Sequence, residues 1–315
     1  MISCKSLISG LALAFTPVAP ALAAPAAEAV LSQPVEQDAP PAPAFIQAHP
    51  ALWVIRNADT TIYLFGTIHL LRQEILWFDG PVRRAFDTAQ EVVLEVTDDG
   101  GNETQALLTA RGMNPDAPTL SSQLPKEQGE KLLAAMADNG APAILFDRVK
   151  PWLAAMTLPV LVIEKLGYSA ASGVDRAIKA EALAAGKTLV GLETTAEQLG
   201  FFDALPHDLQ LALLSQTIDE LPVLPQIIAQ MMAAWSAGEP DRLAALMNES
   251  IDSNSGLRKL LLTDRNARWA DWIADRLERP GTVFLAVGAG HLAGDDSVQQ
   301  MLRQRGIETT RVPQD

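Results

Sequence analysis

Two segments far apart in the chain share one pattern, an apolar run that leads into Gly-x-x-His. The run Thr61–Phe65 is followed by Gly66-Thr67-Ile68-His69, and the run Thr282–Val287 by Gly288-Ala289-Gly290-His291. Short apolar runs that end at glycine are typical of buried strands. In an α/β sheet, the loops beyond the carboxyl ends of the strands form the ligand crevice. If the two strands lie side by side, both histidines reach the same edge of the sheet.

The rest of the chain alternates strand-like runs with helical patterns, which predicts an α/β fold. We expect strands at Leu52–Ile55, Thr61–Phe65, Glu91–Val96, Lys187–Leu192, Thr282–Val287 and Glu308–Val312. Helical patterns cover Pro81–Gln90, Asp264–Arg279, Ser297–Arg305 and much of residues 126–248. The sequence therefore predicts a central mixed or parallel sheet built from two βαβ-like units, with a large helical insertion at about 126–248.

The first residues have the composition of a targeting segment. Lys5, the apolar run Leu7–Phe15 and Ala21-Leu22-Ala23 follow the order of a secretory signal peptide, so we expect residues 1–23 to be removed on export. An uncleaved anchor is the alternative, but the apolar run is shorter than the roughly 20 residues that span a bilayer. Residues 24–48, rich in Ala and Pro, are expected to form a disordered leader before a single domain at 49–315. The mature protein is then periplasmic or secreted, without a membrane span.

Charge and cysteine content narrow the range of partners. The chain has 24 Lys and Arg against 38 Asp and Glu, a net charge of −14. This excess argues against nucleic acid, because a phosphate backbone attracts a basic surface. The single cysteine, Cys4, lies in the predicted signal segment, which excludes a disulfide framework and a cysteine-based zinc site. The sequence leaves the oligomeric state open.

The two motif histidines are the strongest candidates for chemistry. His69 and His291 each follow a predicted strand through a glycine turn, and glycine allows the backbone to bend sharply there. The motif glycines are Gly66, Gly288 and Gly290. A neutral imidazole is the commonest metal ligand and a proton shuttle near neutral pH. The alternative for each histidine is a hydrogen-bonded turn residue without chemistry.

Two carboxylates complete the expected ligand set. Glu95 and Glu193 end two further predicted strands, so they belong at the same edge of the sheet as the histidines. Glu95 could instead face water in an acidic loop with Asp98 and Asp99. Glu193 could instead cap the helix that follows it.

An arginine at the start of a predicted helix is a further candidate for the site. Arg265 and Asn266 open a long predicted helix, where a guanidinium could bind a carboxylate or phosphate of a substrate in a forked contact. A surface salt bridge with Asp264 or Asp271 is the alternative, and the sequence by itself favours it.

The helical insertion carries few signals of function. Met231-Met232 lies near Ile227, Ile228 and Trp235 at helical spacing, which favours core packing. A methionine-lined peptide groove is the alternative. The familiar His-Glu-x-x-His, Gly-x-Ser-x-Gly and phosphate-loop motifs do not occur in the sequence.

Several short motifs resemble those of one known family. They are Leu52-Trp53-Val54, Tyr63–Leu71, Val93–Val96, Lys150-Pro151-Trp152, Gly173-Val174-Asp175, Gly191–Thr194, Arg265-Asn266 and, as the most specific, Phe284–Gly294. Together they resemble the TraB/PrgY/GumN family, to which the Tiki proteases belong, and in particular its exported GumN-like branch. The resemblance implies a fold related to the erythromycin-esterase and ChaN-like proteins. It also implies a metal-dependent peptidase that uses manganese- or cobalt-type ions, with His69, His291 and Glu95 as the motif residues.

The first functional hypothesis is an exported metal-dependent hydrolase, of the peptidase kind. His69, His291 and Glu95 would hold a divalent ion that activates water and polarises the scissile carbonyl. Resemblance favours Mn²⁺ or Co²⁺, and the mix of imidazole and carboxylate also suits Zn²⁺ or Fe²⁺. Glu193, or one of Asp295 and Asp296, would be the general base. Arg265 would assist catalysis by binding the substrate.

The second hypothesis is a periplasmic accessory protein without turnover. It would use the same histidines to bind a metal or haem, or would assist polysaccharide export. A scaffold that has kept only the fold is less consistent with the presence of both histidines and Glu95. No sequence feature separates the hydrolase from the accessory protein.

Overall fold

A six-stranded mixed sheet forms the centre of the molecule. The computed structural model describes residues 45–97, 101–248 and 255–314. The strand order is β6-β5-β7-β3-β2-β8. The strands are β2 (Leu52–Arg56), β3 (Thr60–Thr67), β5 (Glu91–Leu94), β6 (Thr188–Gly191), β7 (Gly281–Gly288) and β8 (Thr310–Arg311). Only β2 runs against the others, because it pairs antiparallel with both β3 and β8. The predicted α/β fold with a mixed sheet is confirmed.

The two motif strands are direct neighbours. β3 and β7 pair in parallel from Thr60 opposite Gly281 to Thr67 opposite Gly288. Both strands are almost completely buried, which explains their continuous apolar sequence. The register therefore brings the two Gly-x-x-His segments out of the sheet at the same level.

Helices cover both faces of the sheet. On one face, α2 (Gly80–Thr88) and α7 (Val174–Ala184) pack against a core that includes Phe65 and Phe284. On the other face, α13 (Asp264–Leu277) and α14 (Val298–Gln304) pack against Leu64 and Leu285. The side chains of neighbouring residues in one strand thus enter different cores, as the alternation along a strand requires.

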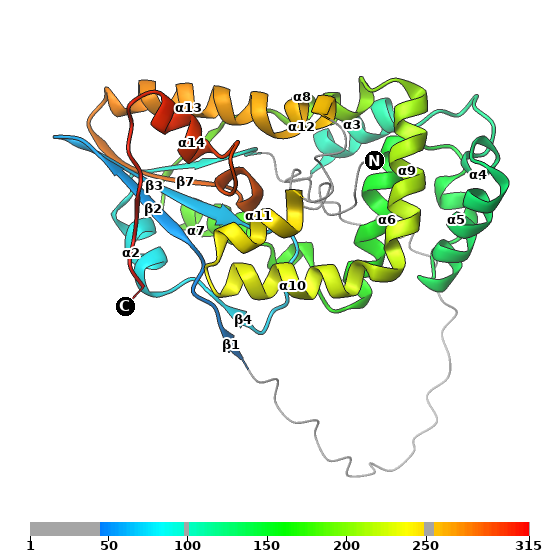
Figure 1. The fold of residues 1–315 in the computed structure, drawn as a ribbon, viewed down its shortest axis with the longest axis horizontal. Helices are drawn as coiled ribbons and strands as arrows, with labels where there is room; N and C mark the ends of the chain where they lie inside the picture. Colours follow the sequence, from blue (N-terminus) through cyan, green and yellow to red (C-terminus); the bar gives the residue numbers. More distant parts are fainter. Residues whose placement is uncertain (1–44, 98–100, 249–254, 315) are drawn as a thin grey trace, which may run out of the picture.

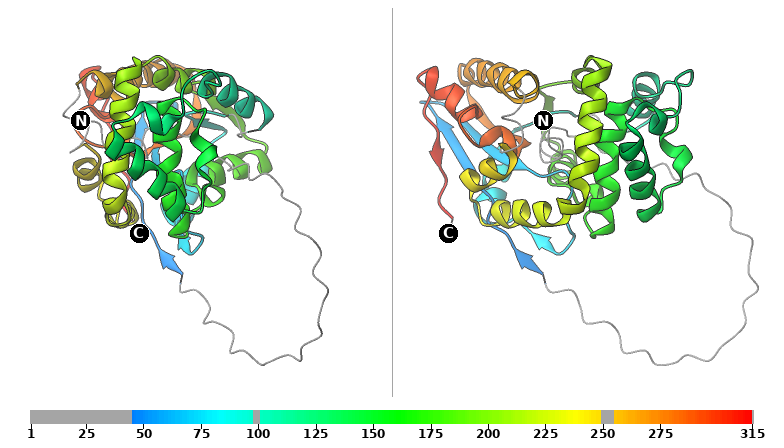
Figure 2. Two further views of the ribbon diagram at one scale, coloured as in Figure 1. Left: turned by 90° about the vertical axis from the view of Figure 1, so that its right-hand side faces the viewer. Right: turned by 45° about the vertical axis from the view of Figure 1, so that its right-hand side comes forward.

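A helical layer lies beyond the carboxyl ends of the strands (Figure 1). It contains α3 (Asn102–Gly112), α4 (Leu120–Gln123), α5 (Lys126–Asp138), α6 (Pro151–Lys165), α8 (Thr195–Asp203), α9 (His207–Glu220), α10 (Leu224–Ser236), α11 (Pro240–Asn248) and α12 (Ser255–Arg258). Figures 1 and 2 show α4, α5, α6 and α9 stacked against one another on this side. The indole Nε1 of Trp235 in α10 donates to the carbonyl of Gly66 at 2.9 Å, which ties the layer to the first motif.

The features predicted for the amino terminus lie mainly outside the described residues. The expected signal peptide, residues 1–23, and most of the expected leader lie in residues 1–44, which the structure does not describe. Within the leader's last residues, β1 (Ile46–Gln47) pairs in parallel with β4 (Ile75–Leu76), and Ala48 is buried. The described part of the chain contains no helix long and apolar enough to cross a membrane.

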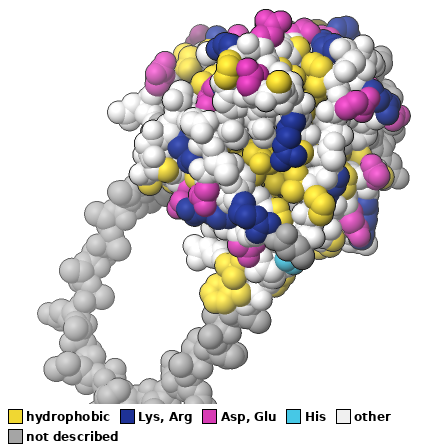
Figure 3. Space-filling model, turned by 90° about the vertical axis from the view of Figure 1, so that its left-hand side faces the viewer, with side chains coloured by type: hydrophobic (Ala, Val, Ile, Leu, Met, Phe, Trp, Pro, Cys, Tyr) yellow, Lys and Arg dark blue, Asp and Glu magenta, His cyan; other side chains and the backbone are white. Residues whose placement is uncertain are grey.

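On one end of the molecule, charged side chains of both signs are mixed rather than gathered by sign (Figure 3). Figure 3 shows the end of the molecule away from α5 and α9, where acidic and basic side chains alternate around a small gathering of hydrophobic ones. The net charge of −14 is therefore not concentrated on this end.

Candidate active site

His69 leaves the end of β3 and is held by a carboxylate. Its Nδ1 lies 2.9 Å from Oδ1 of Asp175, in the first turn of α7. Because a carboxylate only accepts, Nδ1 carries the proton and Nε2 keeps its lone pair. That Nε2 is buried and has no hydrogen-bond partner among the described residues. Burial opposes protonation, but the charge and hydrogen bond of Asp175 outweigh it and raise the pKa of His69 above its ordinary value.

The turn before α7 fixes the backbone of His69. The backbone N–H of Val174 donates to the carbonyl of Ile68 at 2.9 Å. Gly173 lies against the carbonyl of His69, and a Cβ at this position would be 2.3 Å from that oxygen. Only glycine allows this approach, so the motif Gly173-Val174-Asp175 positions both the backbone and the imidazole of His69.

Arg265 is the centre of a second group of side chains. Its guanidinium is fully buried and donates to Glu193 through Nε and Nη2, at 2.9 and 2.7 Å. Nη2 also donates to Oε2 of Glu95 at 2.8 Å. Burial opposes the charge of Arg265, but the two carboxylates outweigh it and raise its pKa. One cation is thus shared by two buried anions.

Both carboxylates are fully engaged by donors. Oε1 of Glu95 accepts from the backbone N–H of Gly288 at 2.6 Å, which links β5 to the second motif. Nε2 of Gln198 lies 3.1 Å from an oxygen of each carboxylate. Arg268 adds a contact of 3.3 Å to Glu193. These bonds hold the side chains of Glu95 and Glu193 in fixed orientations.

His291 faces the same guanidinium. Its Nδ1 lies 2.6 Å from Oδ1 of Asn266, while Nδ2 of Asn266 donates to the carbonyl of Asp296. The amide therefore accepts from Nδ1, and the unprotonated Nε2 accepts from Nη1 of Arg265 at 3.1 Å. Burial, followed by the charges of Arg265 and His69, holds the pKa of His291 well below its ordinary value. His291 is neutral at pH 7.

The structure brings most of the predicted site residues together. Glu95, Glu193, Arg265 and His291 form one bonded cluster, and His69 lies on the neighbouring strand end with Asp175 as its partner. The alternative functions considered for Glu95 and Arg265 do not apply, because the side chains of both are buried. Helix α8 is capped by Thr194 and Glu197, so Glu193 is not its cap.

The side chains of the two aspartates after the second motif, Asp295 and Asp296, do not join the cluster around Arg265. Asp296 binds Arg258 at 2.7 Å and the hydroxyl of Thr263 at 2.9 Å. For Asp295 the structure records no contact with the cluster. The structure shows no hydrogen bond between the carboxylate of Asp295 or Asp296 and either His69 or His291.

The donors only partly fit a metal ion. His69 fits, since its buried Nε2 has no partner among the described residues and a carboxylate orients the ring, as carboxylates do for metal-bound histidines. His291 and Glu95 fit by donor type, but both already bind the guanidinium of Arg265. Across residues 45–97, 101–248 and 255–314, no three His, Cys, Asp or Glu side chains surround a common point suited to a metal.

Sequence reasoning missed several residues that shape the site. Asp175 was visible only as part of a family motif, without an assigned role. Gln198, which joins the two carboxylates, and Trp269, whose ring centroid lies 4.4 Å from that of His291, carried no signal. Asn266 was considered as a substrate-binding residue, whereas it holds the tautomer of His291.

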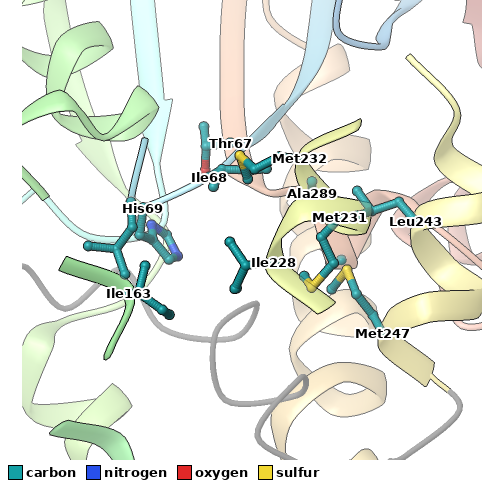
Figure 4. A pocket seen from close by; sticks show the side chains of 12 residues that line it. Thr67, Ile68, His69, Ile163, Ile228, Met231, Met232, Leu243, Met247 and Ala289 are labelled. Atoms are coloured by element: carbon teal, nitrogen blue, oxygen red, sulfur yellow. The ribbon is translucent and has the colours of Figure 1, made fainter. Parts of the chain in front are cut away.

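An apolar pocket opens beside His69 (Figure 4). Its lining includes the end of β3, the start of the second motif at Ala289, and side chains from α6, α10 and α11. Figure 4 shows the imidazole of His69 on one side and Met231 and Met247 on the other, with Ile228 between them.

These features define an α/β protein with its site at the carboxyl edge of a mixed sheet, where two Gly-x-x-His histidines flank a buried Glu–Arg–Glu cluster. The chain belongs to the TraB/PrgY/gumN family, which matches residues 51–311. No solved structure matches the chain.

Three relatives illustrate the range of the family. An uncharacterized protein of Escherichia coli strain K12, YbaP, is 26% identical over 254 residues, which cover 81% of this chain and 92% of YbaP. An uncharacterized protein of Treponema pallidum is 22% identical over 273 residues, 81% of this chain and 80% of that protein. Metalloprotease TIKI2 of Danio rerio is 25% identical over 316 residues, 83% of this chain and 61% of TIKI2.

Proposed function

We propose that this protein is an exported metal-dependent hydrolase that cleaves peptide bonds. Two distant relatives bear the name metalloprotease, and they span most of this chain. The observation that carries the proposal is the buried Nε2 of His69, which has no partner among the described residues, is oriented by Asp175 and lies beside a pocket. A buried acceptor without a partner costs free energy, and a bound ion or water would satisfy it.

His69 is the best-supported ligand of the proposed ion. His291 and Glu95 are the further ligands that family resemblance indicates, and both present the right donor types. When bound, a divalent ion lowers the pKa of water and polarises a carbonyl. Mn²⁺ or Co²⁺ is our choice from resemblance, with Zn²⁺ and Fe²⁺ as chemically suitable alternatives.

The chain's own residues prepare this site electrostatically. Asp175 fixes the ring of His69 and increases the basicity of its Nε2. Arg265 pairs with both Glu95 and Glu193 and holds their carboxylates in fixed orientations. Because its oxygens accept from Arg265, Gln198 and Arg268, we assign Glu193 to positioning Arg265 rather than to proton transfer.

Metal-dependent turnover is the test. The purified mature protein is treated with a chelator, then assayed on a peptide library with and without Mn²⁺, Co²⁺, Zn²⁺ or Fe²⁺. We expect the chelator to abolish cleavage and Mn²⁺ or Co²⁺ to restore it. Asp175→Asn is expected to lower metal affinity or activity by about 10- to 100-fold, the usual effect of losing such a partner.

The matched control is Asp271→Asn, which removes an exposed carboxylate of α13 that pairs with Arg305. It should leave metal affinity and turnover unchanged. Cleavage that persists after complete metal removal would contradict the proposal. Tight metal binding without cleavage of any peptide would instead support the accessory protein.

A further inference from the structure

The pocket beside His69 has walls of one chemical kind. Apart from the two motif segments, it is lined by aliphatic and thioether side chains of three helices, Ile163, Ile228, Met231, Met232, Leu243 and Met247. These helices belong to the layer beyond the strand ends (Figures 1 and 4). Such a surface excludes charged groups and favours an apolar one.

Two buried polar atoms stand at the strand end of this pocket. Among the described residues that line it, polar side chains come only from Thr67 and His69. The hydroxyl of Thr67 and Nε2 of His69 are both buried, and both are without a hydrogen-bond partner there. Buried polar groups are nearly always satisfied, so a polar group of a ligand or a water molecule is expected to pair with these two atoms at the strand end.

The combination matches one residue of a peptide. An amide group offers a hydrogen-bond partner to the hydroxyl of Thr67, beside the position that the proposed function gives to an ion on Nε2 of His69. The side chain next to that amide would enter the apolar part. The pocket leaves about 30 Å³ for the centre of a water-sized sphere, which is room for about two water-sized groups before its walls move. Methionine side chains are flexible, so they are the walls that can be altered with the least strain.

We propose that this pocket is the specificity subsite of the enzyme and that it receives a small aliphatic side chain, as of Ala or Val, adjacent to the scissile amide. The inference rests on the proposed function, because it names the substrate class of the same site. Met231 and Met232 limit the size of the side chain, and Thr67 positions the neighbouring amide.

Substrate preference tests the subsite. Peptides that differ at one position, with Gly, Ala, Val, Leu or Phe, are compared by kcat/KM. We expect the unmodified enzyme to prefer Ala and Val. Met231→Ala and Met232→Ala should shift the preference toward Leu or Phe by 10-fold or more, since a methylene in a hydrophobic pocket contributes about 10- to 200-fold to discrimination. An unchanged rank order in both variants would overturn the proposal.

Met136→Ala is the matched control. Met136 is a buried methionine of α5 that does not line the pocket, so its truncation costs comparable packing but should leave the rank order unchanged. A shift of the same size in this variant would attribute the effect to general loosening and would overturn the inference.

A binding measurement tests the subsite independently of catalysis. Titration calorimetry of the metal-free protein with N-acetyl-valine amide, N-acetyl-glycine amide and N-acetyl-phenylalanine amide requires no turnover. We expect the valine derivative to bind tightest, and Met232→Ala to improve binding of the phenylalanine derivative. If no peptide is cleaved but this order holds, the proposed function fails and the subsite stands. If peptides are cleaved without this order, the subsite fails alone.

Discussion

At the scale of single residues, Arg265 is the side chain that connects most of the candidate site through hydrogen bonds. It contributes one positive charge to two buried carboxylates and also donates to the imidazole of His291. Ions so far from water are stable only while they are paired and hydrogen-bonded. The arginine therefore stabilises both carboxylates in their buried positions.

Replacing this arginine is expected to be strongly destabilising. Arg265→Leu leaves two buried carboxylates without a cation, and loss of one partner of a buried pair costs about 3–5 kcal/mol. Urea denaturation at pH 7 measures the free energy of unfolding. Adding Glu95→Gln and Glu193→Gln should recover part of the loss, because the unpaired charges are then removed.

Arg305→Leu serves as the control for that experiment. Arg305 pairs with Asp271 where the carboxylate is largely exposed, and such pairs contribute only about 0–1 kcal/mol. If Arg265→Leu lowers the free energy of unfolding no more than Arg305→Leu does, the buried cluster is not held together by charge.

The sequence was informative about which residues reach the site and less so about what they bind. His69, His291, Glu95 and Glu193 all end strands, and strand ends are visible in the sequence. The partner of His69 was not visible, since an acidic residue in a first helical turn such as Asp175 is ordinarily explained by the helix dipole. Arg265 lies in a strongly amphipathic helix, where a charged residue is normally placed on the solvent face.

At the scale of elements, the junction between β3 and α7 depends on close backbone contact. Gly173 has φ −55° and ψ 140°, a conformation that alanine also adopts, so its requirement is purely steric. The contact with the carbonyl of His69 leaves no room for a methyl group.

Gly173→Ala is therefore expected to displace His69 with little change elsewhere. A shift of about 1 Å in a catalytic group can cost roughly 100-fold in rate, so kcat/KM on a cleaved peptide should fall by that order. Gly200→Ala is the control: Gly200 lies within α8, where a Cβ would approach only the end of the Arg111 side chain. That variant should keep full activity and gain about 0.5–1 kcal/mol in stability. Equal activity of the two variants would contradict this role of Gly173.

The elements themselves were predictable where burial is continuous. β3 and β7 were expected to within one or two residues, because their apolar runs are bounded by turn residues. The expected strand Glu308–Val312 is reduced to Thr310–Arg311, since it pairs only with the edge of β2. Helix α3 was missed because it buries only Thr104, Leu108 and Gly112, which form no apolar face that sequence periodicity can detect.

At the scale of the whole molecule, the first prediction concerns export. The order of basic, apolar and small residues in residues 1–23 predicts cleavage after Ala23. Mass spectrometry of the exported protein should give an amino terminus at Ala24. Ala23→Arg, which removes the small residue before the cut, should leave a longer chain. Exported wild-type protein that retains Met1 would contradict cleavage.

The strand order could not be read from the sequence. β7 inserts between β3 and β5 although most of the chain separates it from both, and no local pattern encodes such a long-range pairing. The same holds for the contact of Trp235 with the carbonyl of Gly66. Local patterns specify elements, whereas the choice of neighbours is made by the packing of the complete core.

The pairing of β3 with β7 also has a consequence for biogenesis. Chains are synthesised from the amino end, so β3 emerges long before its parallel neighbour exists. Until Gly281–Gly288 has been made, one edge of an apolar strand remains open, and open strand edges promote association with other chains. A nascent chain halted short of β7 should thus be a preferred client of chaperones. Translation of β7 joins β3 to β5 and brings the second motif to the candidate site in the same step.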